Sequence, residues 1–128
     1  MSTQTITEFL EARIAEDEAV ALGADHRDGG RWRHDPEYNC VWDGTGGAAA
    51  SNVRPAANSR TGEHIARHDP ARVLAECAAK RAIIGACLSI EKKKFDDNLW
   101  NIDEHDEILE ALAAVYADHE DYDSGWAL

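Results

Sequence analysis

Apolar residues recur at helical spacing in three separate segments of this chain of 128 residues, and no other feature limits its fold as strongly. The segments cover about residues 7–22, 69–92 and 98–117. Side chains three or four positions apart share one face of a helix, so each segment forms an apolar stripe that another element must cover. The sequence therefore predicts a mainly α-helical domain whose three long helices pack as a bundle.

Residues at the expected helix ends support these assignments. Thr5 and Glu8 have the spacing of a capping box, in which a hydroxyl and a glutamate bind the free N–H groups of the first turn. Asp69 before Pro70 is typical of a helix start, because aspartate caps the end and proline has no N–H to leave unpaired. A short helical turn is predicted just before them, at about residues 62–67.

The stretch from residue 24 to residue 60 interrupts the helical pattern. It is rich in Gly, Asp, Asn and Pro, and two short strand-like runs, around 38–42 and 50–53, flank the turn sequence Asp43–Gly47. These features predict a small β-hairpin inserted between the first and second helices. An isolated hairpin is marginal, so it must pack on the helices. We expect an α+β fold in a single domain, residues 1–128.

The ends and the cysteines indicate where such a chain resides. The N-terminus lacks the basic flank and apolar run of a signal peptide, and no apolar run reaches the roughly 20 residues that cross a bilayer. The cysteines are odd in number, and Cys77 and Cys87 lie on one predicted helix about 15 Å apart, too far for a disulfide. We expect a cytoplasmic protein with no membrane contact.

Negative charge is concentrated in the last quarter of the chain. The formal net charge is −12, yet all 13 Lys and Arg precede residue 95. Residues 96–128 hold eleven Asp and Glu, and they include an acidic tail, residues 118–128. Such a surface repels nucleic acid and anionic lipid and attracts basic protein surfaces. The alternative is a solvated face that contributes only to solubility.

Our leading interpretation is a small non-enzymatic binding or regulatory protein that meets a basic protein partner through the third helix and the tail. Direct binding to nucleic acid is not expected from so acidic a surface. Trp126 is either an interface anchor or a residue that pins the tail to the helices. The candidate binding residues are Asp103, Glu104, Asp106, Glu107, Glu110 and Trp126.

A second interpretation is a metal-binding protein, with hydrolysis as one role for the metal. His64 and His68 are four positions apart, so in a helix both imidazoles lie on one face and could bind one divalent ion. Asp69, Asp118 or His119 could complete the ligand set. Two imidazoles are only half of a metal site, and the alternative is that they are polar groups at a helix junction. No cofactor is predicted outside this interpretation.

A third interpretation is a structural homo-oligomer in which the hairpin or the second helix forms the interface. Enzyme motifs give no competing signal. The glycine-rich turn at residues 44–47 lacks the Gly-Lys-Ser/Thr ending of a phosphate-binding loop, for example. We therefore name no catalytic residue and favour a protein that is not an enzyme.

Three stretches of the chain are distinctive together: EFLEARIAEDE at 8–18, HIARHDPARVLAE at 64–76 with KRAII at 80–84, and YADHEDY at 116–122. In this order they resemble an uncharacterised family of small proteins from actinobacteria and their phages, a domain of unknown function. Members of that family usually carry proline near the positions of Val115 and Glu120. This chain lacks both prolines, so its third helix need not end where theirs does.

The resemblance implies a bacterial or phage cytosol and no known activity. One version of the leading interpretation follows from it: a phage-encoded inhibitor whose acidic surface mimics a phosphate backbone and occupies a host nucleic-acid enzyme. It also draws attention to the polar residues within the matching stretches, which are His64, His68, Asp69, Arg72, Asp118 and His119.

Overall fold

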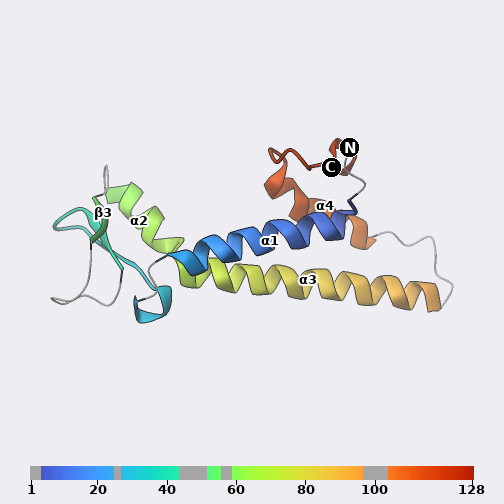
Figure 1. Cartoon of the computed structure of the whole chain (residues 1–128), viewed down its shortest axis with the longest axis horizontal. Helices are drawn as coiled ribbons and strands as arrows, with labels where there is room; N and C mark the ends of the chain where they lie inside the picture. The colour runs from blue at the N-terminus through green and yellow to red at the C-terminus, as the bar shows by residue number, and fades with distance from the viewer. Residues whose placement is uncertain (1–3, 25–26, 44–51, 56–58, 97–103) are drawn as a thin grey trace. The chain divides into compact units, whose positions relative to one another are not determined.

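The computed structural model describes residues 4–24, 27–43, 52–55, 59–96 and 104–128 (Figure 1). Its contacts divide the chain into two compact units. The terminal unit comprises Met1–Glu16 and Ala78–Leu128, and the central unit comprises Asp17–Cys77. None of the helices in the described part of the chain combines the length and the apolarity that crossing a membrane requires.

The protein is mainly helical with a small antiparallel β-element, which confirms the predicted α+β fold class. The elements that form helices are α1 (Ile6–Gly23), η1 (Arg27–Gly30), α2 (Ser59–Arg67), α3 (Pro70–Asp96), α4 (Glu104–Ala113), η2 (Ala114–Tyr116) and η3 (Ser124–Trp126). The predicted capping box begins α1: the Glu8 N–H donates to Thr5 Oγ1 at 3.1 Å, and Thr5 Oγ1 donates to Glu8 Oε1 at 2.9 Å.

The terminal unit has a core built from three helices. Its buried apolar side chains come from the first half of α1, the second half of α3, and α4, and they are Phe9, Leu10, Ile14, Ile84, Cys87, Leu109 and Ala113. Arg81 Nε on α3 lies 4.0 Å from Glu11 Oε2 on α1, which is a weak exposed ion pair at the edge of this core. Burial, and next the negative charge of Asp106, raises the pKa of the Cys87 thiol, so this cysteine acts as an apolar packing group.

The third predicted helix ends earlier in the structure than the sequence indicated. Its expected start, residues 98–103, lies outside the described residues, and the α-helix that the structure does describe, α4, ends at Ala113 instead of continuing to about residue 117. Beyond it the backbone hydrogen bonds span three residues, as in 3₁₀ turns: the His119 N–H donates to the Tyr116 carbonyl, and the Tyr122 N–H donates to the His119 carbonyl. Side chains three positions apart then lie above one another, which an α-helix would not allow.

The central unit contains a three-stranded antiparallel sheet in the order β1 (Arg33–Asp35), β2 (Cys40–Trp42) and β3 (Asn52–Pro55). The pairing of β2 with β3 confirms the predicted hairpin, with Cys40 opposite Pro55, while the turn at residues 44–51 lies outside the described residues. The sequence did not predict β1, which pairs with the other edge of β2 and places Asp35 opposite Cys40.

Asp35 closes the turn between β1 and β2. Its Oδ1 accepts the N–H groups of Glu37 and Tyr38 at 3.0 and 3.3 Å, and its Oδ2 accepts the indole N–H of Trp42 at 3.1 Å. Desolvation raises the pKa of Asp35, but the bonds from Trp42, Tyr38 and Glu37 and the charge of Arg33 outweigh it, so the pKa lies below its ordinary value.

Asp69 begins α3 as the sequence predicted. Its Oδ1 accepts the Arg72 N–H at 2.9 Å, which is the bond of an N-cap, and Pro70 is the first helical residue. Its second carboxylate oxygen, Oδ2, accepts the backbone N–H of Trp32 at 3.1 Å. One side chain therefore caps a helix and fixes the segment that leads into β1.

Candidate functional site

The C-terminal segment, residues 114–128, folds against α1 and does not extend as a free tail. Phe9 of α1 is fully buried, and the rings that contact it all come from this segment. The distances between ring centroids are 6.3 Å to Tyr116, 5.8 Å to His119, 6.1 Å to Tyr122 and 5.1 Å to Trp126. Because the segment is built from turns of three residues, successive aromatic side chains reach the same phenyl ring.

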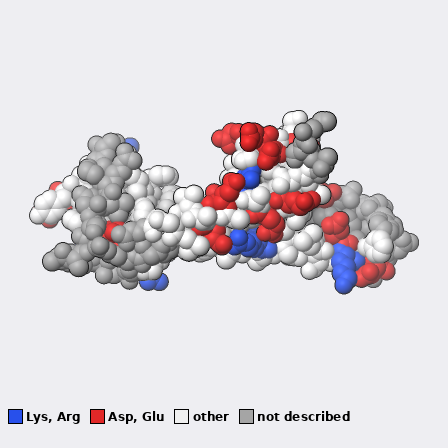
Figure 2. All heavy atoms as spheres, in the orientation of Figure 1, with Lys and Arg blue, Asp and Glu red and all other residues white. Residues whose placement is uncertain are grey.

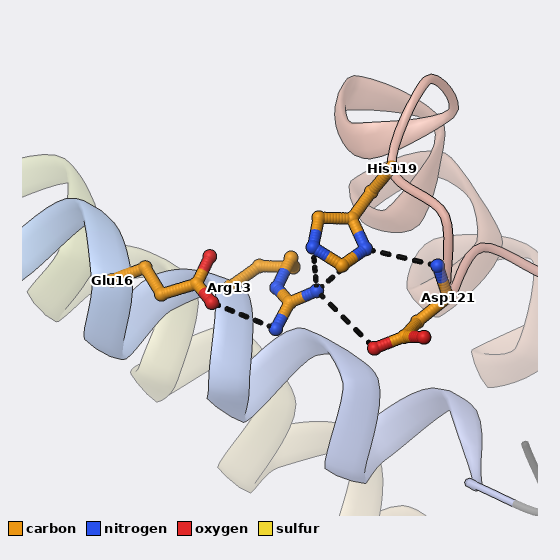
Figure 3. A network of polar contacts seen from close by, with 4 residues as sticks. All are labelled: Arg13, Glu16, His119 and Asp121. Atoms are coloured by element: carbon orange, nitrogen blue, oxygen red, sulfur yellow. Dashed lines mark hydrogen bonds and ion pairs between the residues drawn. The ribbon is translucent and has the colours of Figure 1, made fainter.

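Arg13, one helical turn after Phe9, forms the polar half of this contact (Figure 3). Its side chain is only 8% exposed, and its Nη2 donates to Glu16 Oε1 at 2.9 Å. Its Nη1 lies 2.7 Å from His119 Nδ1, also contacts His119 Nε2, and lies 3.8 Å from Asp121 Oδ2. The guanidinium therefore meets both carboxylates and the imidazole at once.

Two N–H donors face Nδ1 of His119. A guanidinium has only N–H donors, and the backbone N–H of Asp121 also points at Nδ1 of His119, at 3.0 Å. Nδ1 of His119 therefore acts as the acceptor for these N–H groups. We name the group of Phe9, Arg13, His119 and Asp121 the α1 clamp, because it holds the C-terminal segment on α1.

Lys80 of α3 holds the same segment from a second helix. Its Nζ donates to the Tyr116 hydroxyl at 3.2 Å and lies 5.3 Å from the centre of the Tyr116 ring. Two helices therefore fix the start of the C-terminal segment, one through an aromatic and guanidinium contact and one through an ammonium group.

The candidate acidic residues mostly face solvent. Asp106 and Glu107 of α4 are exposed and Glu110 is half-buried, while Asp103 and the Glu104 side chain lie outside the described residues. Figure 2 shows Asp and Glu side chains gathered over the C-terminal segment and α1. Within the described part of the chain, Glu107, Glu110, Asp118 and Glu120 make no ion pair with a Lys or Arg.

Trp126, the candidate interface anchor, packs within its own unit. It is half-buried, 5.1 Å from the Phe9 ring and 5.6 Å from the Tyr122 ring. This is the alternative that the sequence left open, in which the tryptophan pins the tail to a helix.

The histidines proposed as metal ligands have separate environments. His64 and His68 lie side by side at the end of α2, with ring centroids 4.6 Å apart, and both are exposed. Both carboxylate oxygens of Asp69 already accept N–H groups, Asp118 is exposed, and His119 contacts Arg13. No group of three or more His, Cys, Asp and Glu able to hold a metal ion occurs among the residues that the structure describes.

The sequence reasoning missed Phe9 and Arg13 as members of a site. A signal was present, since Arg13 occupies a position within the apolar stripe that also contains Phe9, Leu10 and Ile14. A lone arginine on the buried face of a helix needs partners, and here they come from the other end of the chain.

The model of one protein family, described as a family of unknown function (DUF6221), matches residues 3–128, so the chain belongs to this family. No curated protein and no solved structure matches the chain.

Proposed function

We propose that this member of the DUF6221 family is a non-enzymatic binding protein that presents the carboxylates of α4 and the C-terminal segment to a basic protein surface. The observation that supports the proposal most directly is the α1 clamp. It holds the C-terminal segment in one conformation while Asp118, Glu120 and Asp123 remain exposed.

The clamp matters because binding has an entropic cost. A flexible acidic tail would lose conformational freedom when it bound, whereas carboxylates on a folded segment are already in place. Residues 104–128 contain eight Asp and Glu and no Lys or Arg, and of these Asp121 lies near Arg13. The remaining charges would speed encounter with a basic surface and repel nucleic acid.

The class of partner follows from this charge. A basic protein surface, such as one that otherwise contacts a phosphate backbone, has the complementary sign of charge. The cytoplasm of a bacterium, or of a bacterium infected by a phage, is the setting that we propose for it.

The test uses a lysine-rich peptide as the probe and a glutamate-rich peptide as its control. We expect the full chain to bind only the first, with an affinity that falls steeply between low and high salt. The variant Asp118→Asn, Glu120→Gln, Asp123→Asn should bind about tenfold more weakly.

The matched control is Glu37→Gln, Glu63→Gln, Glu91→Gln, which removes the same charge from three exposed positions elsewhere. Equal losses in the two variants would show that only net charge matters. That result, or binding that ignores salt, would contradict the proposed surface.

A further inference from the structure

The outer surface of α3 in the terminal unit carries no charge for about three turns. Between Ala78 and Ile90 only Ile84 and Cys87 are buried. The two charged residues in this stretch turn onto their own unit, because Lys80 contacts Tyr116 and Arg81 lies near Glu11. A surface helix normally places charged and polar residues on its outer face, and this face of α3 lacks the charged ones.

Four residues of this face have the spacing of a coiled-coil seam. Ala79, Ile83, Ala86 and Ile90 follow one another at intervals of four, three and four positions. All four are exposed, with Ile83 at 39% and Ile90 at 47% of their full surface. We name these four residues the α3 seam.

We propose that the α3 seam binds the α3 seam of a second copy of this chain, with the two helices antiparallel. In that arrangement Ile83 lies opposite Ala86 of the second copy, and Ile90 lies opposite its Ala79. Every isoleucine therefore meets an alanine. Both copies use the same four residues, and a two-fold rotation exchanges them, as a symmetric dimer requires. A parallel pairing would set isoleucine against isoleucine and alanine against alanine, which packs unevenly.

The charges at the ends of the seam complement the same register. Opposite positions in this antiparallel pairing place Lys93 of one copy beside Glu76 of the other, and symmetry makes this contact twice. Both residues lie on α3 itself and are exposed, and Glu76 Oε1 also accepts from Arg72 Nε at 2.9 Å. A parallel pairing would instead place Glu76 beside Glu76 of the second copy and Lys93 beside its Lys93, so that like charges would repel.

The size of the seam sets the strength of the dimer. A few turns of one helix bury less than the roughly 800 Å² per partner of a standard interface. We therefore expect a reversible dimer with a dissociation constant on the order of micromolar.

Sedimentation velocity of the full chain from about 1 to 200 µM tests the dimer. We expect the mass to rise toward two chains, and Ala86→Glu to weaken the dimer by at least about tenfold. Ala78→Glu is the matched control, because Ala78 is exposed on α3 but lies outside the seam, and it should leave the dimer intact.

Charge reversal tests the antiparallel register. Glu76→Lys and Lys93→Glu should each weaken the dimer, and the double variant should restore it. A monomer at all concentrations would overturn the proposal. Equal effects of Ala86→Glu and Ala78→Glu, or no rescue by the double variant, would also overturn it.

Discussion

Nη1 of Arg13 lies 2.7 Å from Nδ1 of His119, although 106 positions separate the two residues in the sequence. The contact joins the first helix to the C-terminal segment and surrounds a nearly buried guanidinium with an imidazole and two carboxylates. The sequence suggested His119 as a metal ligand, whereas in the structure its ring contacts Arg13.

Replacing Arg13 should destabilise the protein. Arg13→Ala removes the hydrogen bonds to Glu16 and His119 and leaves space in a packed region, so we expect a loss of about 1–3 kcal/mol in the free energy of unfolding. Its partners are partly exposed and can be hydrated, which limits the cost. Urea unfolding measures it, and Arg72→Ala is the control, because that arginine bonds a glutamate at the same distance on an exposed surface. Equal losses would contradict the role of burial.

Phe9 should be the strongest single anchor of the C-terminal segment. Phe9→Ala removes the ring that four side chains contact, and we expect a loss of about 3–5 kcal/mol. Amide exchange should increase first in the C-terminal segment. Phe95→Ala deletes a ring that is 63% exposed and should change stability little. Unaltered exchange after Phe9→Ala would show that the segment does not depend on this ring.

Substitutions of His119 should separate its charge from its shape. His119→Asn keeps an acceptor for Arg13, whereas His119→Lys places a second cation beside it. We expect the lysine variant to be the less stable of the two by about 1 kcal/mol or more. Thermal unfolding by circular dichroism at neutral pH gives the comparison. If both variants lose the same stability, the imidazole acts only by filling space.

The sheet of the central unit should weaken in acid because of Asp35. Its pKa is lower in the folded protein than in the unfolded chain, so its contribution is present above the ordinary carboxylate pKa of about 4 and is lost as the pH falls through the folded pKa. The indole N–H resonance of Trp42 should shift over that range, and Asp35→Asn should abolish the shift. Glu37→Gln should leave it unchanged, and a shift that survives Asp35→Asn would refute the assignment.

Local sequence determined where α1 and α3 begin. The Thr5–Glu8 capping box and the Asp69–Pro70 start could be read directly, because each involves partners within four residues. Short elements could not be read in this way: β1 is three residues, Arg33–Asp35, with no apolar alternation, and it becomes a strand only because β2 offers it a free edge. Likewise, helical spacing in the sequence places Val20 on the apolar stripe of α1, but Val20 is 77% exposed, while Ala21 beside it is buried.

The α1 clamp shows what only the tertiary structure decided. The sequence established that the first helix has an apolar stripe and that the last residues are acidic. It could not show that His119, Tyr122 and Trp126 return to Phe9, because that contact depends on the path of about a hundred intervening residues. Periodicity reports which face of a helix is buried, whereas the identity of the covering group is set by how the whole chain folds back.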